Sequence, residues 1–257
     1  MYICGILRLY IRRNNLIIVV DNISKSFSNQ NVLNNISFNI QQGEAVAIIG
    51  KSGIGKSVLL KHLNGLIIPD SGKIIVDDQE INSMTFKKLE KVRSKISMVF
   101  QFGALFDSMT VYDNIALGLE KMTSLNKDEI KNRVFETLEE VGMGDSENKY
   151  PSDLSGGMKK RVGIARAIAV KPKYLLYDEP TTGLDPIMTD SINKLISKLH
   201  ALENVTSIIV THEMKTVYDV SKRVIMLDDG VIRYDGSSQD VQSSSDLAVQ
   251  NFINGVS

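Results

Sequence analysis

Apolar residues gather along the chain in short runs that are typical of strands. Within a run, apolar and polar residues alternate where only one face of the strand is buried. The run is wholly apolar where both faces are buried. The runs lie at 16–23, 32–40, 45–49, 73–76, 96–100, 174–177 and 206–210. Two further runs, 223–227 and 231–234, predict a hairpin because Asp229-Gly230 between them is typical of a tight turn.

The middle of the chain, about 102–170, has the apolar period of a helix instead. Residues recur there at helical spacing: Ile130, Val134, Leu138 and Val141. Asn126 and Glu129 precede them at the spacing of a capping box. Another helix is predicted after Asp185, with Pro186 at its first position. Strands that alternate with helices predict an α/β domain, into which the helical middle is inserted.

Composition limits the classes of protein that remain. The chain has 257 residues, 43% of them apolar, which is enough for a sizeable core. Thirty basic residues balance thirty acidic ones, so we expect no nucleic-acid partner. No apolar run approaches the roughly 20 residues that span a bilayer. The single cysteine, Cys4, excludes an internal disulfide and favours a reducing compartment.

A glycine-rich loop follows the apolar run 45–49 and precedes a helical stretch. Gly50-Lys51-Ser52-Gly53-Ile54-Gly55-Lys56-Ser57 has the form G-x-x-x-x-G-K-[ST] at every fixed position. Its backbone N–H groups can surround phosphate oxygens, and the helix N-terminus adds partial positive charge. We expect Lys56 to reach the β- and γ-phosphates. The residues expected to contact the nucleotide here are Gly50, Ser52, Gly53, Gly55, Lys56, Ser57 and Val58.

Two carboxylates end the apolar run at 174–177. Asp178 is expected to hold Mg²⁺ together with the Ser57 hydroxyl. Glu179 is expected to orient or deprotonate the attacking water. An apolar strand followed by two acidic residues is weak evidence for a nucleotide site when it stands alone. It becomes strong evidence here, because a phosphate loop lies about 120 residues before it.

A second helix start also has the composition of an anion site. Ser155-Gly156-Gly157, within Leu154–Met158, precedes a helix that runs from about 158 to 170. This pentapeptide resembles the signature sequence of ABC-type ATPases, in which Ser155, Gly156 and Gly157 would bind the ATP held by another subunit. The resemblance implies a P-loop NTPase fold: a RecA-like core with an N-terminal antiparallel β part and an inserted helical subdomain.

Four more positions match the pattern of this family. By resemblance, Gln101 would sense Mg²⁺ and the γ-phosphate, and Asp185 would belong to the D-loop. His212 would contact the γ-phosphate, and Phe27 would stack on adenine, although Phe27 is also compatible with a core position. The resemblance implies ATP and Mg²⁺ as cofactors, and catalysis by Glu179, His212, Gln101 and Lys56.

Four segments narrow the resemblance to the ATPases of Mce/Mla-type lipid transporters: Gln101–Asn114, Leu154–Arg161, Glu179–Pro186 and the C-terminal Val249–Gly255. This branch implies a homodimer bound to an integral-membrane permease at the cytoplasmic face of the inner membrane. It also implies an Mce-domain substrate-binding protein and a STAS-type regulator, with membrane contact only through partners. The cargo would be phospholipid moved between the membranes of a double-membraned bacterium.

Two other functions remain open. An importer ATPase for a polar solute such as an amino acid would carry the same catalytic motifs. A non-transport ABC protein acting on DNA or ribosomes is disfavoured by the neutral charge and by the single ATPase cassette.

The predicted organisation has three parts. An extension, 1–17, precedes an ABC ATPase domain at 18–236 with its helical subdomain at about 102–170, and a C-terminal extension covers 237–257. The first 15 residues mix apolar residues with three arginines, so they are either an unstructured extension, which we favour, or a basic amphipathic tether. The apolar segment 102–117 is either core of the helical subdomain or a groove for a short helix of a membrane partner.

Overall fold

The computed structural model describes residues 16–28, 30–203 and 205–255. The predicted extension 1–17 therefore lies outside the described residues, except for its last two positions, which begin the first strand. Within the described ranges, no helix is long and apolar enough to cross a membrane.

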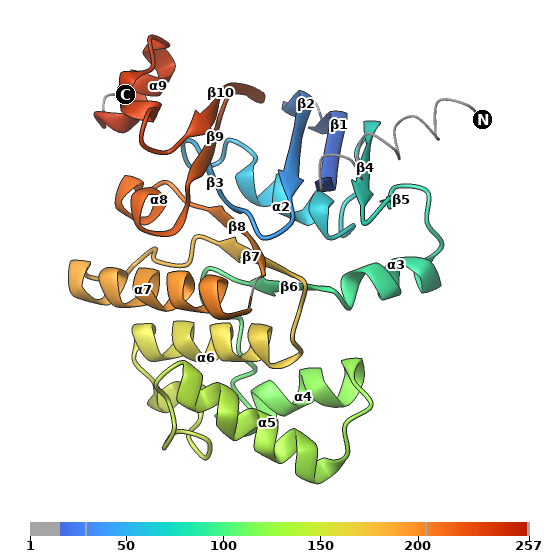
Figure 1. Cartoon of the computed structure of the whole chain (residues 1–257), viewed down its shortest axis with the longest axis vertical. Coiled ribbons are helices and arrows are strands. Elements are labelled where there is room, and N and C mark those ends of the chain that lie inside the picture. The colour runs from blue at the N-terminus through green and yellow to red at the C-terminus, as the bar shows by residue number, and fades with distance from the viewer. Residues whose placement is uncertain (1–15, 29, 204, 256–257) are drawn as a thin grey trace.

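Two sheets form the upper part of the molecule (Figure 1). One is mainly parallel and packs with helices and the other is antiparallel, which confirms the predicted α/β fold. The larger sheet has the strand order β10-β9-β3-β8-β7-β6, parallel except for β10. Its strands are β3 (Ala45–Ile49), β6 (Ile96–Val99), β7 (Tyr174–Asp178), β8 (Thr206–Val210), β9 (Arg223–Asp228) and β10 (Val231–Ser237). The smaller sheet is antiparallel, in the order β2-β1-β4-β5. Its strands are β1 (Leu16–Phe27), β2 (Gln30–Gln41), β4 (Ser71–Val76) and β5 (Gln79–Glu80).

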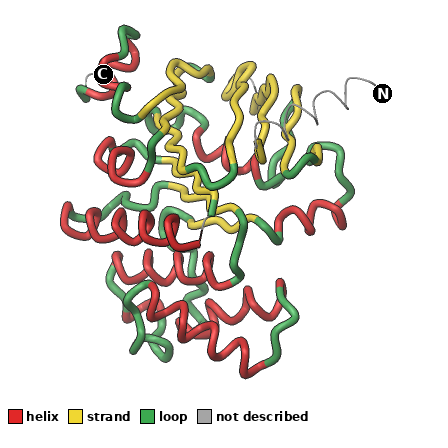
Figure 2. Tube along the Cα trace, in the orientation of Figure 1, coloured by secondary structure: helices red, strands yellow, loops and turns green. Residues whose placement is uncertain are grey.

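The helices fall into groups on either side of the larger sheet. They are α2 (Lys56–Leu63), α3 (Phe86–Arg93), α4 (Val111–Met122), α5 (Lys127–Glu140), α6 (Gly156–Ala169), α7 (Pro186–Glu203), α8 (Met214–Val220) and α9 (Leu247–Ile253). Short 3-10 turns lie at Pro151–Asp153 and Val241–Ser243. Helices α4, α5 and α6 form a layer at the end of the molecule away from the antiparallel sheet (Figure 2).

Local signals that the sequence carries are present in the structure. Asn126 accepts hydrogen bonds from the backbone N–H groups of Asp128 and Glu129, and the Glu129 carboxylate accepts from the Asn126 N–H, which completes the predicted capping box. The predicted hairpin is β9–β10, whose two loop residues, Asp229 and Gly230, both have left-handed φ angles, 48° and 73°. These contacts are short in sequence, which is why they could be predicted.

Alternation along the strands divides the core between the two faces of the larger sheet. In β7, Leu175 and Tyr177 join the cluster beneath α4–α7, whereas Tyr174 and Leu176 join the cluster that includes α2 and the antiparallel sheet. Because successive side chains of a strand point to opposite faces, one apolar run supports both layers. The wholly apolar runs predicted as buried strands are buried for this reason.

The segment that follows β6 serves as both core and surface. Leu105 packs against the core cluster of the helical layer, and Val111 is buried in it. The rings of Phe102 and Phe106 remain 76% and 51% exposed. The segment 102–117 thus has buried side chains that serve the core of the helical subdomain and exposed side chains that could contact a helix of a membrane partner.

Within the C-terminal residues 237–255, Val241 and α9 pack against β3 and β9 of the larger sheet. Val249 in α9 is buried, and Phe252 and Ile253 pack on the same cluster, which includes Ala47 and Ile49 of β3. This segment is therefore anchored to the sheet that carries the phosphate loop.

Candidate nucleotide-binding site

The loop between β3 and α2 surrounds a hollow of about 480 Å³ at the carboxyl ends of the parallel strands. Its glycines Gly50, Gly53 and Gly55 all have φ angles in the left-handed half, 149°, 80° and 105°. A Cβ at Gly55 would lie 2.8 Å from Val32 Cγ1, whereas a Cβ at Gly53 would meet nothing within 4 Å. The loop is therefore tightly packed against β2 at Gly55 and open at Gly53, as a phosphate-binding loop requires.

Lys56 provides a buried cation at the centre of this loop. Its side chain is 5% exposed, and its ammonium donates to the carbonyls of Gly50 (2.7 Å) and Lys51 (3.0 Å). Its Nζ also lies 3.6 Å from Glu179 Oε1. Burial lowers the pKa of Lys56, and the charge of Glu179 opposes that shift. A phosphate group could replace the carbonyl contacts with stronger charge-assisted hydrogen bonds.

Ser57 and Asp178 place two oxygen ligands side by side. The Ser57 hydroxyl donates to Asp178 Oδ1 at 2.8 Å. Burial raises the pKa of Asp178, whereas the Ser57 hydrogen bond and nearby lysines oppose the shift. A hydroxyl and one carboxylate are the oxygen ligands that Mg²⁺ takes alongside substrate phosphates, so this pair fits the metal.

Glu179 is held in an uncommon backbone conformation directly after β7. Its φ angle is 50°, a left-handed value that costs a non-glycine residue about 1–2 kcal/mol. The carboxylate Oε2 accepts from the Thr182 hydroxyl at 2.9 Å and from His212 Nδ1 at 2.8 Å. Strain of this kind persists only where surrounding contacts fix the residue, and these contacts aim Glu179 into the hollow.

Most of the predicted residues line this hollow, together with residues that the sequence did not single out. The lining consists of Gln30, Val32, Ser52, Gly53, Gly55, Lys56, Ser57, Val58, Gln101, Glu179, Thr182 and His212. Gln30, Val32 and Thr182 were not predicted as site residues. Gln30 and Val32 come from β2, and only the tertiary fold brings that strand to the loop.

Phe27 lies at the edge of the hollow and does not line it. It pairs with Gln30 in the antiparallel sheet, its ring is 44% exposed, and the Lys25 ammonium lies 5.4 Å from the ring centroid. An exposed ring beside the hollow is available to stack on a base, so its predicted role stays a prediction.

The second predicted anion site forms a separate surface at the start of α6. Ser155 accepts from the Met158 N–H at 3.3 Å, and Gly156 is exposed. A Cβ at Gly156 would lie 4.0 Å from Leu184 Cδ2, next to Asp185, which accepts from the Met188 N–H. None of Ser155, Gly156 and Asp185 lines the hollow around Lys56.

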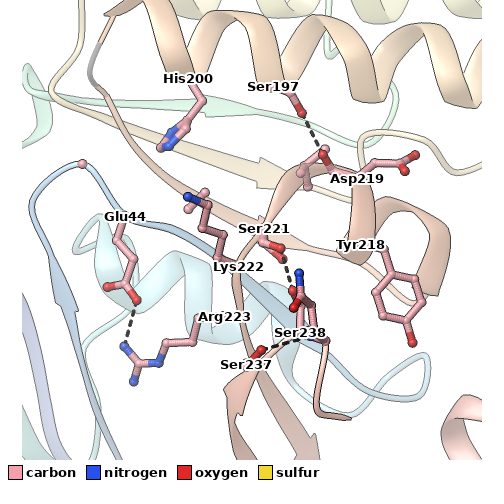
Figure 3. A pocket seen from close by; sticks show the side chains of 14 residues that line it. Glu44, Ser197, His200, Tyr218, Asp219, Ser221, Lys222, Arg223, Ser237 and Ser238 are labelled. Carbon is pink, nitrogen blue, oxygen red and sulfur yellow. Dashed lines mark hydrogen bonds and ion pairs between the residues drawn. The ribbon is translucent and has the colours of Figure 1, made fainter. Parts of the chain in front are cut away.

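A larger hollow, of about 810 Å³, lies at the amino ends of β3 and β9 (Figure 3). Its Arg223 is paired with Asp235 and Glu44, which hold the pKa of the guanidinium above its usual range. Burial lowers the pKa of His200, because it disfavours the charged imidazolium. No predicted site residue lines this hollow, so volume alone does not identify the nucleotide site.

Comparison with known proteins identifies the class that this fold and loop define. Residues 33–182 match the ABC transporter family, and the chain belongs to that family. It is one of the family's ATP-binding cassettes, which use ATP with Mg²⁺.

Two of the relatives found by sequence are named as methionine import proteins. The methionine import ATP-binding protein MetN of Carboxydothermus hydrogenoformans is 46% identical over 209 residues, 81% of this chain and 62% of that protein. MetN 2 of Bacillus cereus is 41% identical over 241 residues, 92% of this chain and 71% of that protein. This chain thus spans less than two thirds of the first of these relatives.

Solved structures agree on the fold. The dimeric, post-hydrolysis ATP-binding cassette MJ0796 bound to ADP and Pi has a TM-score of 0.79 at 31% identity, and covers 86% of this chain and 98% of its own. CbiO1 of Clostridium perfringens, part of the ABC transporter complex cbiONQ, has a TM-score of 0.82 at 33% identity. It covers 93% of this chain and 95% of its own.

These findings leave one expectation from the sequence without support. The predicted likeness to the lipid-transport branch, whose ATPase is MlaF, has no support from these relatives, which are named methionine importers. The catalytic motifs are shared between the two branches, so they could not have separated them.

Proposed function

We propose that this chain is the ATP-hydrolysing subunit of an ABC importer for a polar solute, with an amino acid such as methionine as the candidate. The observation that carries the ATPase part is that Lys56, Ser57 and Glu179 line one hollow, with Asp178 hydrogen-bonded to the Ser57 hydroxyl. The names of the relatives support the importer part.

Each side chain in the hollow has a definite task in this proposal. The ammonium of Lys56 binds the β- and γ-phosphates, and the loop N–H groups surround them. Mg²⁺, when bound by Ser57 and Asp178, would neutralise charge that develops on the phosphate oxygens. Gln101, which lines the same hollow, would contact that ion and the γ-phosphate.

Glu179 and His212 would act on the water and the γ-phosphate. The water oxygen forms a bond to the γ-phosphorus while the bond to the β–γ bridging oxygen breaks, and Glu179 accepts the proton that the water loses. His212, whose Nδ1 donates to Glu179, holds the carboxylate and presents its other nitrogen to the γ-phosphate. The products are ADP and phosphate.

A homodimer would complete each site. The start of α6 carries N–H groups suited to an anion but lies on a surface of its own, so the ATP that it contacts would be bound by another copy. The dimeric cassette MJ0796 supports this arrangement by its likeness to this chain. Two-fold symmetry gives two equivalent ATP sites.

A permease would dock at the apolar segment after β6. A hollow of about 440 Å³ there is lined by Phe100, Ala104, Phe106 and Met122, among other residues. It is suited to a short amphipathic helix. Gln101 is next to Phe100 in the chain, so changes at the γ-phosphate could reach the docked helix. In this arrangement the chain would lie at the cytoplasmic face of the cell membrane, and contact the membrane only through its partners.

Replacement of the predicted catalytic carboxylate tests the ATPase part. Glu179→Gln keeps the size of the side chain and its contact to Thr182, and should lower kcat at least about 100-fold while ATP still binds. Turnover is measured by phosphate release, and binding with a fluorescent ATP analogue. A variant with normal turnover would remove Glu179 from the proposed mechanism.

Lipid trafficking is the second candidate, and one specific feature favours it. Phe102 and Phe106 are large apolar side chains left exposed on the segment that resembles the lipid-transport branch. In that case the partners would include an Mce-domain protein and a STAS-type regulator.

Purification of the tagged chain from its native membranes distinguishes the two candidates. A permease that co-purifies with a soluble solute-binding protein, identified by mass spectrometry, supports the polar importer. A permease with an Mce-domain protein and bound phospholipid supports lipid trafficking. Recovery with ribosomes and no permease would contradict both.

A further inference from the structure

Lys160 is a buried cation that the proposed reaction does not use. It lies on the inner face of α6, five residues after Ser155, and is 5% exposed. Burial lowers its pKa, and the carboxylates of Glu213 and Glu179 oppose the shift. An apolar side chain at this position would avoid the cost of burying the ammonium, so packing alone does not explain a lysine here.

The ammonium of Lys160 joins α6 to the turn that carries Glu179. It donates to the carbonyl of Thr182 at 2.9 Å and to the carbonyl of Glu179 at 3.3 Å. Both acceptors are backbone atoms, so the contact fixes the path of the chain and does not involve the carboxylate of Glu179. The same turn holds Glu179 at its φ of 50° and places the Thr182 hydroxyl on Glu179 Oε2.

Three observations therefore point to a connection through Lys160 between the start of α6 and the turn at 179–182. Ser155 and Gly156 at the start of α6 are exposed. Glu179, in the turn at 179–182, has a left-handed φ angle. The ammonium of Lys160 joins these two elements by donating to two carbonyls of the turn. A helix is stiff along its axis, so a shift at Ser155 is passed to Lys160 with little loss. The two carbonyls would then follow the ammonium.

We propose that Lys160 is a positioning residue that transmits the state of the α6 N-terminus to Glu179 of the same chain. The proposal rests on the catalytic role proposed for Glu179 and on the dimer. In a two-fold dimer, α6 of one copy would contact the ATP of the other copy. Lys160 would then make hydrolysis at one site depend on ATP at its neighbour.

The test compares variants of the full chain purified with its membrane partners. Lys160→Met removes the donors while it keeps the length of the side chain, and should lower kcat at least tenfold with the KM for ATP within twofold. The Hill coefficient for ATP should fall toward one. Lys160→Arg keeps the charge and the donors, and should recover most of the turnover. Lys159→Met, one residue away and half-buried, is the matched control and should change neither.

The outcomes separate this proposal from a purely structural role and from a failure of the proposed function. Normal kcat and Hill coefficient in Lys160→Met would overturn the link. A parallel loss of ATP binding and of turnover, which Lys160→Arg does not repair, would also overturn it, because it would show a folding role. If Lys160→Met does not fold, Lys160→Gln is measured against the same criteria, and normal turnover in it with an unchanged Hill coefficient also counts against the link. Glu179→Gln is assayed in parallel, and normal turnover in that variant would contradict the proposed function itself.

Discussion

Helices α2 and α6 begin alike in sequence and differently in structure. Both starts combine serine and glycine, and both present backbone N–H groups to an anion. Helix α2 begins inside a hollow, beside the buried ammonium of Lys56 and the oxygens of Ser57 and Asp178. Helix α6 begins on a surface, with Ser155 engaged as the cap.

The difference shows what turns a helix start into a binding site within one chain. The helix dipole alone contributes about 0.3–1 kcal/mol, which is too little to hold a nucleotide. At α2 the left-handed loop and the buried ammonium of Lys56 supply the remaining binding free energy. At α6 none of the described residues just before the helix has a left-handed φ angle, and the buried ammonium of Lys160 donates to the carbonyls of Glu179 and Thr182 instead of facing the helix start. The proposed partner must therefore bring the nucleotide.

The largest expected effect is at α2. Lys56→Ala should weaken ATP binding roughly 100-fold, because it removes the ammonium and leaves the buried Glu179 carboxylate without that partner. Titration calorimetry with ATP measures the effect. Lys61→Ala, on the exposed side of the same helix, is the control. Equal affinity in the two variants would contradict the phosphate role of Lys56.

The next effect should be at α6, and in turnover alone. Gly156→Asp fits, because the space around a Cβ there is open to 4.0 Å, and an acidic residue suits the first turn of a helix. It should lower kcat about tenfold by repelling the partner's ATP phosphates, with ATP affinity of the isolated chain unchanged. Gly156→Ala introduces the Cβ without the charge and should retain most activity. Reduced affinity in the isolated chain would show that α6 serves the chain's own ATP.

A third variant, at Asp178 of β7, which contacts Ser57 of α2, separates stability from function. Burial raises the pKa of Asp178, so the folded chain disfavours its charged form and loses stability as pH rises through that pKa. Asp178→Asn should raise Tm by about 2 °C at neutral pH and weaken Mg²⁺-dependent ATP binding. The gain in Tm should shrink as pH falls, because Asp178 is then protonated. A lower Tm at neutral pH would mean that the charge stabilises the fold.

The smallest effect should be at a third helix start, which lies outside both regions. Asn126 caps α5 by accepting from two backbone N–H groups. Asn126→Ala should cost about 1 kcal/mol of unfolding free energy, with ATP binding unchanged. Urea unfolding measures it, and Lys127→Ala is the control. A change in ATP affinity would show that this cap also serves the nucleotide site.

The sequence by itself determined the features that depend on residues close together in the chain. The phosphate loop, the capping box at Asn126 and the β9–β10 hairpin follow from neighbours whose types and spacing permit few conformations. The order of motifs also identified the family, to which the comparisons assign residues 33–182.

Only the tertiary structure decided how distant residues meet. It divided the apolar segment after Gln101, with Leu105 packed on the core and Phe102 exposed, because that choice depends on helices far along the chain. It also buried Lys160 and aimed it at the carbonyls of a turn about 20 residues away. The sequence does hold a signal, since Lys160 stands four residues before Ile164 on the buried side of α6. A lysine can bury its stem or extend into water, and only the elements packed around it determine which occurs.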